Sequence, residues 1–391
     1  MKERRTLRCN KEWLHKYHLA LLSVVMVTVP FFNGINSIAI GVYAGFVFFC
    51  SGIRVRKSLP EIILVVAVGA FFLLTILDPR GFFLDAGKHL GFLLRLLPLF
   101  LIPIAYSSWS GKRISMEEIT MILTVSSLCA MIFGTYTAIE FYTRPEEHFS
   151  FIHLPHTITG KYHSVYFSIQ LGINVLLAAF SFKRTKSYYY LLIAIVLFVF
   201  MTLLGKRMAL LALCALALLF VLRNLNLKAI LVFLFSIGIA GAVYLYSPYN
   251  RWRMEQFDSN GEGSERMIMM TESMNIIKDH FFVGVSPIGV SSELEKKYSE
   301  RGIATPFYSN NPHDLPLYVF MAFGLFGFLT YYILQLMLLV VGIRGNKTAF
   351  IYVLLFFLAV SVSETILIRQ NGIVLYAFIL PIIFYEGRKD T

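Results

Sequence analysis

Charged residues are scarce in this sequence. Only 15% of its 391 residues are Asp, Glu, Lys or Arg, whereas 57% are hydrophobic, and the mean hydropathy is +0.68. A soluble globular domain carries far more charge than this and does not contain repeated apolar runs of membrane-spanning length. The composition therefore excludes the soluble classes and predicts an all-α, polytopic integral membrane protein.

Cysteine is also scarce. The chain has four cysteines (Cys9, Cys50, Cys129 and Cys214), and the last three fall inside apolar runs. None lies in residues 247–314, the longest polar stretch, so this stretch has no disulfide framework. There is no C-x-x-C or other metal-ligand spacing, and we expect neither a metal site nor a cofactor.

Several motifs are missing as well. No Walker motif occurs, which argues against ATP-driven transport. No small-residue cleavage site follows the first apolar run, which predicts a retained first helix instead of a removed signal peptide. The net charge of +12 comes from basic residues dispersed among short loops, so we expect no nucleic-acid partner.

The apolar runs predict about twelve transmembrane helices, since a span needs about 20 apolar residues. Their centres lie near residues 25, 44, 69, 98, 130, 173, 196, 214, 238, 328, 357 and 378. Basic residues in alternate short connections fall on the side of the basic amino terminus. We therefore expect a multi-pass protein of the bacterial inner membrane with both termini in the cytoplasm.

Residues 247–314 interrupt this pattern. We predict a single membrane domain over residues 1–391, with residues 247–314 forming one large, partly helical loop between the ninth and tenth spans. The topology places that loop on the outer face, which is the periplasm in a Gram-negative cell. We expect the loop to cover an active site that faces the periplasm.

Cations and a histidine stand out near this outer face. Lys206 and Arg207 are adjacent between two spans, where ionisable groups are costly and often bind a counter-ion. Arg266 lies in the first turn of a predicted helix, where its charge opposes the helix dipole. His313 directly precedes a span and is suited to accept a proton near neutral pH. The alternatives are snorkelling cations, a surface ion pair of Arg266, and a polar cap at His313.

Weaker candidates lie at the same predicted face. Lys88 and Arg95 share one face of the fourth span, and Arg95 interrupts an apolar run as though it faced a polar cavity. His163 and Tyr166 begin the sixth span and could reach the same mouth. Asp314 could fix the tautomer of the neighbouring histidine.

Glu364 and Arg369 bracket the outer end of the last two spans. Opposite charges at such a spacing suggest a mutual ion pair that pins the turn between them. The simplest account of the two residues is therefore structural.

The order of these features resembles the O-antigen ligase/polymerase superfamily. The resemblance rests on Arg207, Arg266, the glycine-spaced segment 280–289, His313 and the Gly-Leu-Phe-Gly of residues 324–327. Two positions depart from the pattern: Ser286 replaces a second glycine, which we expect to matter little, and Asp314 replaces an asparagine.

The resemblance implies a metal-independent, inverting membrane glycosyltransferase. Its donor would be a glycan on undecaprenyl pyrophosphate, and its acceptor a lipid A-core sugar in lipopolysaccharide biosynthesis, among membrane lipids. Carried onto this sequence, Arg207 and Arg266 would bind the donor pyrophosphate, with Lys206 in possible support. His313 would activate the acceptor hydroxyl.

Alternative functions remain at this point. A repeat-unit polymerase of the same superfamily would use a second lipid-linked glycan as its acceptor. A flippase or secondary transporter for lipid-linked oligosaccharides would also fit many spans and buried cations. The single large polar loop and the absence of visible internal repeats argue against the transporter.

Overall fold

The computed structural model describes residues 11–31, 33–53, 58–142, 163–224, 262–302 and 311–386, together with residues 234, 237–238, 241–242 and 245–246. The span predicted near residue 238 and residues 247–261 and 303–310 of the polar loop lie largely outside these ranges. Within the described ranges the chain is entirely helical, as the sequence predicted, and forms no strand.

The amino-terminal helices are α1 (Lys11–Thr28), α2 (Asn33–Ser51), α3 (Leu59–Val68), α4 (Ala70–Ile76), α5 (Pro79–Leu84), α6 (Ala86–Leu96), α7 (Pro98–Ser108) and α8 (Met116–Tyr142). They are followed by α10 (Ser164–Thr185), α11 (Tyr188–Leu203), α12 (Arg207–Asn224), α15 (Glu262–Asp279), α16 (Val290–Glu300), α17 (Leu315–Arg344), α18 (Thr348–Ser361) and α19 (Gln370–Tyr385).

Among the described helices, five are long and apolar enough to cross a membrane, or six if the bent pair α3 and α4 is one span. α3 and α4 meet at Gly69 with a bend of 64°. Three further apolar helices, α11, α18 and α19, are shorter. The structure therefore supports a multi-pass membrane protein, with about half as many clear spans as the sequence predicted.

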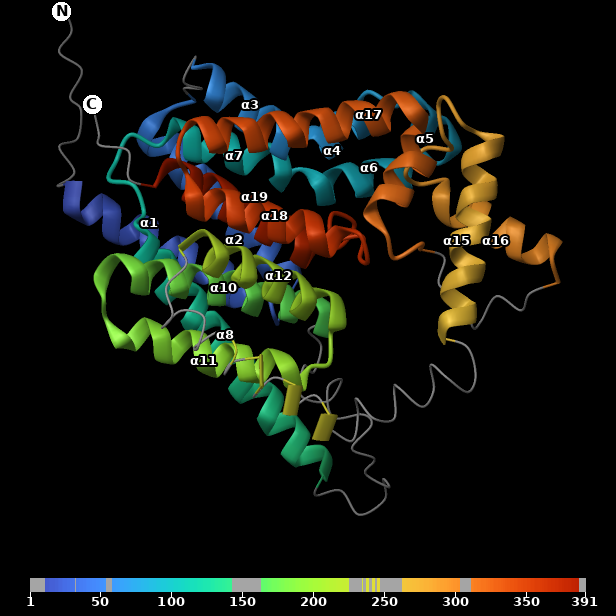
Figure 1. Ribbon diagram of the computed structural model, residues 1–391. Coiled ribbons are helices and arrows are strands. Elements are labelled where there is room, and N and C mark those ends of the chain that lie inside the picture. The colour runs from blue at the N-terminus through green and yellow to red at the C-terminus, as the bar shows by residue number, and fades with distance from the viewer. Residues whose placement is uncertain are drawn as a thin grey trace, which may run out of the picture.

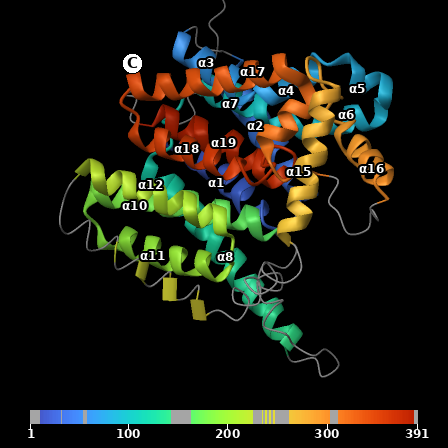
Figure 2. The same cartoon turned by 45° about the vertical axis from the view of Figure 1, so that its right-hand side comes forward.

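The helices pack side by side around α19, which is buried along nearly its whole length (Figures 1 and 2). Polar side chains also join neighbouring helices inside the bundle. Gln170 of α10 donates to Ser126 Oγ of α8 at 3.0 Å, and Thr120 pairs with Ser181 at 3.1 Å. Such bonds hold helices together where lipid provides no hydrophobic driving force.

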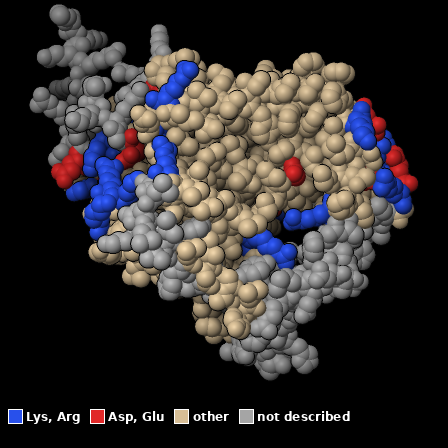
Figure 3. Space-filling view, in the orientation of Figure 1, with Lys and Arg blue, Asp and Glu red and all other residues tan. Residues whose placement is uncertain are grey.

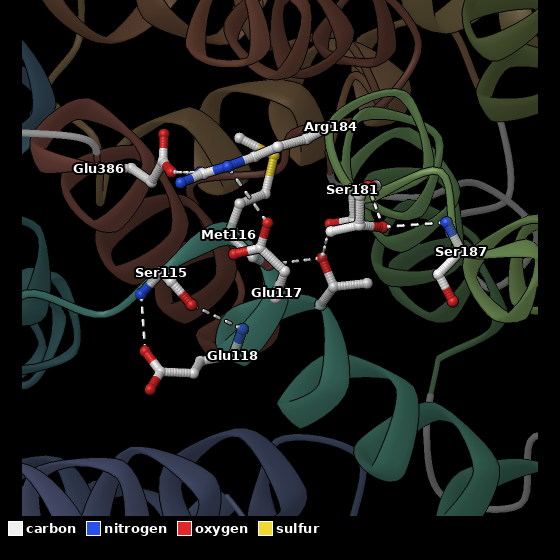
Figure 4. A network of polar contacts seen from close by, with 10 residues as sticks. Ser115, Met116, Glu117, Glu118, Ser181, Arg184, Ser187 and Glu386 are labelled. Carbon is white, nitrogen blue, oxygen red and sulfur yellow. Dashed lines mark hydrogen bonds and ion pairs between the residues drawn. The ribbon is translucent and has the colours of Figure 1, made fainter.

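One end of the bundle is tied by ionic contacts (Figure 4). Arg184, in the last turn of α10, pairs with Glu386 after α19, and its Nε lies 3.5 Å from Oε1 of Glu117. Ser115 and Glu118 form a reciprocal capping box at the start of α8. Charged side chains gather at the two ends of the face in Figure 3, with a nearly uncharged band between them.

The described part of the polar loop is built against α17. After α15, the segment 280–289 crosses α17 where Gly324 leaves helical geometry, with φ 65° and ψ −167°. Val285 and Ser286 donate their backbone N–H groups to the carbonyls of Met321 and Ala322 at 2.8 and 2.9 Å, and Leu325 N donates to Phe281 O. The glycine-spaced segment therefore replaces hydrogen bonds that the break in α17 leaves unmade.

Arg80 of α5 forms hydrogen bonds to both backbone segments where segment 280–289 crosses α17. Its guanidinium donates to the carbonyl of Gly284 at 2.6 Å and to that of Ala322 at 3.4 Å, while its Nε lies 2.7 Å from Asp78. Carbonyl oxygens at a helix break need such donors when they are withdrawn from water. The polar loop is thus fixed to the membrane helices through α5 as well as α17.

The expectation that Ser286 matters little is wrong. Ser286 has φ 74°, in the left-handed region that favours glycine, and its fully buried Oγ has no hydrogen-bond partner. A side chain in that region costs about 1–2 kcal/mol, and a buried hydroxyl without a partner adds to the cost. The physical reason is that the crossing imposes the backbone angle on whatever residue lies there.

Ser286→Gly is accordingly expected to raise the stability of the protein by about 1 kcal/mol, measured as the thermal unfolding midpoint in detergent. Ser286→Ala is the matched control, because it removes the hydroxyl and keeps the Cβ that strains the backbone. The unfolding midpoint of Ser286→Ala should rise less than that of Ser286→Gly. A lower midpoint for Ser286→Gly would contradict this account of the strain.

Candidate active site

Four segments that are distant in sequence lie on one side of the bundle. The beginnings of α10, α12 and α17 and the connection between α18 and α19 are all at the right in Figure 1, on the side that carries α15. Helix beginnings present unbonded N–H groups and the positive end of the helix dipole. This side of the protein therefore suits an anionic ligand.

His313 is held against a carboxylate on this side. Its Nδ1 lies 3.6 Å from Oε2 of Glu364, and the two side chains are 29% and 7% exposed. Glu364 Oε1 is buried without a hydrogen-bond partner. A carboxylate at Nδ1 favours the tautomer that carries its proton there, so Nε2 becomes the nitrogen able to accept one. The separation is an ion-pair distance, and it places a carboxylate near the nitrogen opposite the one that a general base would use.

The backbone around His313 is fixed by hydrogen bonds. His313 has φ 51°, and its N–H donates to Asn311 Oδ1 at 3.4 Å. Asn311 Nδ2 donates to Thr365 Oγ1 at 2.7 Å, and the hydroxyl of Tyr166 donates to the Thr365 carbonyl at 3.4 Å. The segment before α17, the connection after α18 and the first turn of α10 are thus joined into one polar network.

His163 lies beside this network at the start of α10. Its ring packs edge-on against Tyr166, with centroids 5.5 Å apart, and its Nδ1 is buried without a partner. Burial lowers the pKa of His163 to about 4, helped by the charges of Arg369 and Lys206 and opposed by Glu364. The His163 imidazole is therefore neutral at pH 7 and can exchange hydrogen bonds with a ligand without carrying charge.

Asp314 has another task than orienting His313. Its carboxylate caps α17 by accepting the N–H of Leu317 at 2.7 Å. Burial raises the pKa of Asp314, and the bond from Leu317 opposes that shift. The residue that faces Nδ1 of His313 is Glu364, which lies in the connection between α18 and α19.

The cations of the sequence prediction are placed unequally. Lys206 and Arg207 begin α12, directly after Gly205 in a left-handed turn, and both are partly exposed. Arg266 is exposed in α15. The charges of Lys206 and His313 both lower the pKa of His163. Convergence of Arg207 and Arg266 on a single ligand stays a prediction.

Lys88 and Arg95 lie elsewhere, on α6. Lys88 pairs with Asp85 at 3.2 Å, and both basic side chains are largely exposed. Arg95 therefore does not face an enclosed cavity, as its apolar neighbours had suggested. No contact of the described residues joins either side chain to His313. Within the same part of the chain, no group of three or more His, Cys, Asp or Glu side chains is arranged to hold a metal ion.

A comparison with known protein families gives one match. Residues 191–332 match the family described as O-antigen ligase. This stretch is similar to that family and is called the ligase domain below. The match includes Lys206, Arg207, Arg266 and His313, so the resemblance in the sequence is confirmed for this stretch. No curated protein matches the chain.

The ligase domain does not contain the whole polar network. His163 precedes α10, and Glu364 and Thr365 lie in the connection between α18 and α19, so all three are outside residues 191–332. The helices α10 and α18 that lead to or from them pack against α12 of the domain. The ion pair expected between Glu364 and Arg369 is not formed among the described residues; Glu364 faces His313 instead. Sequence reasoning missed this partnership because charge alone does not tell which of two nearby cations an acid contacts.

Proposed function

We propose that this protein is an O-antigen ligase. It transfers a glycan from undecaprenyl pyrophosphate to a sugar of the lipid A-core on the periplasmic face of the inner membrane. The observation that carries the proposal is the His313–Glu364 pair, whose histidine lies in the stretch that matches the O-antigen ligase family. Members of this family are membrane glycosyltransferases that act on lipid-linked glycans.

The proposed chemistry is an inverting displacement. The acceptor hydroxyl attacks the anomeric carbon of the donor, and the bond from that carbon to the diphosphate oxygen breaks, with its electron pair leaving on the diphosphate. His313 Nε2 takes the hydroxyl proton while Glu364 stabilises the imidazolium that forms. Because the diphosphate leaves as a stable anion, it needs charge stabilisation and no general acid.

Arg207 and Arg266 are proposed to provide that stabilisation. A planar guanidinium donates two parallel hydrogen bonds to phosphate oxygens, and such charge-assisted bonds are about twice as strong as neutral ones. Lys206 is placed to add positive charge at the same helix beginning. The residues act as a permanent counter-charge for the departing undecaprenyl pyrophosphate.

We propose the topology that the basic loops predict, with about twelve spans, both termini in the cytoplasm and residues 247–314 in the periplasm. The side of the bundle that carries α15 and His313 would then face the periplasm and the outer leaflet. The ionic network of Arg184 in Figure 4 would lie at the cytoplasmic end.

Transfer in detergent from a purified lipid-linked donor tests the function. Two acceptors should be offered together, lipid A-core and a second lipid-linked unit, without an ion gradient. A ligase moves the glycan to the core lipid. Elongation of the lipid-linked unit instead would identify a polymerase, and the absence of any transfer by the folded protein would leave the transporter.

A further inference from the structure

Arg369 is an arginine at the mouth of the site that the sequence had assigned to a structural ion pair. It is exposed, and it precedes α19 as its N-cap residue. Among the described residues its side chain forms neither a hydrogen bond nor an ion pair, although Glu364 is close in the same connection. Glu364, the nearby acid, pairs with His313 instead. The exposed guanidinium of Arg369 can therefore contact a ligand.

The position of Arg369 is fixed by the network around His313. Four residues earlier, Thr365 receives the amide of Asn311 and the hydroxyl of Tyr166. On the other side, Arg369 O accepts the N–H of Ile373 at 3.1 Å in the first turn of α19. The guanidinium is thus attached to backbone that is held at both ends next to the proposed general base.

The surroundings of His163 show which charges share this space. Arg369 is the strongest charge acting on that imidazole, and Lys206 acts on it in the same sense. Lys206 precedes α12 and Arg369 precedes α19, so the positive ends of two helix dipoles accompany the two cations.

We infer that Arg369, together with Lys206, binds the diphosphate of the lipid-linked donor, as a cation additional to Arg207 and Arg266. The inference rests on the proposed function for the identity of its ligand. A diphosphate has more oxygen atoms than one guanidinium can contact, so a further arginine adds separate hydrogen bonds. Neutral His163 can donate or accept one more without repelling the cations.

The test is direct binding of undecaprenyl diphosphate to the full-length protein in detergent. Arg369→Gln should weaken binding by about tenfold to a hundredfold, since it removes hydrogen bonds between charged groups. Arg369→Lys keeps the positive charge but lacks the planar guanidinium. Its affinity for the diphosphate should lie between those of the wild type and of Arg369→Gln. Arg344→Gln is the matched control: Arg344 is an exposed arginine in the last turn of α17 and should bind as the wild type does.

Diphosphate affinity equal to that of the wild type in Arg369→Gln would overturn the inference. The unfolding midpoint of each variant, measured without ligand, shows whether the variant folds. If Arg369→Gln does not fold, the affinity of Arg369→Lys is the measurement that decides. Binding and transfer are separate readouts. A wild-type protein that binds the diphosphate through Arg369 but transfers no glycan would refute the ligase proposal and leave this inference standing.

Discussion

His313→Ala is expected to reduce glycan transfer by about a hundredfold or more, because it removes the group that takes the acceptor proton. The protein should reach the same level in the membrane, since the His313 side chain is partly exposed. The measurement is transfer from lipid-linked donor to lipid A-core by the purified protein. His280→Ala, at an exposed histidine after α15, is the matched control and should retain activity.

Glu364→Gln separates orientation of His313 from its chemistry. The glutamine keeps the shape of the side chain and removes the charge that stabilises the imidazolium, so kcat should fall by about tenfold or more. KM for the donor should change little, because Glu364 is proposed to act only as the proton moves. Full transfer by His313→Ala would show that His313 is not the general base. An unchanged kcat in Glu364→Gln would show that the Glu364 carboxylate takes no part in the mechanism.

Gly324→Ala is expected to lower stability by about 3 kcal/mol or more, which is enough to unfold the connection between the polar loop and α17. Gly324 has φ 65°, and a Cβ there would lie 2.3 Å from the carbonyl carbon and oxygen of Phe282. These are backbone atoms of the crossing segment, so neither side can move aside cheaply. The thermal unfolding midpoint and the yield of folded protein measure the effect.

Gly302→Ala is the control that isolates the cause. Gly302 has φ 68°, nearly the same backbone angle, but no atom of the described residues lies within 4 Å of the position of its Cβ. Its substitution should cost only the strain of the left-handed angle, about 1 kcal/mol. Equal losses for the two variants would show that the contact between segment 280–289 and α17 adds nothing to stability.

Much of this organisation could be predicted because membrane proteins obey strong local rules. Runs of apolar residues predict helices, since an unpaired backbone group is costly in lipid. The break of α17 at Gly324 and the closeness of segment 280–289 to it have no such local signal. They depend on backbone hydrogen bonds between residues about 40 positions apart in the chain, such as that from Val285 to Met321.

The number of spans was predicted less well. A hydropathy run does not reveal that α3 and α4 are two helices bent by 64°, or that α11, α18 and α19 are short. Such helices gain their stability from burial against neighbours, as α19 does along almost its whole length. Their length is therefore set by packing as much as by composition.

The sequence by itself determined the all-helical membrane class, the polar loop, and the candidates Arg207, Arg266 and His313 of the ligase domain. Each follows from composition, from the cost of charge near lipid, or from motif order along the chain. Only the tertiary structure decided that Glu364 faces His313 and that Asp314 caps α17. The physical reason is that ion pairs and hydrogen bonds depend on distance in space, and the folding of distant helices against one another sets that distance.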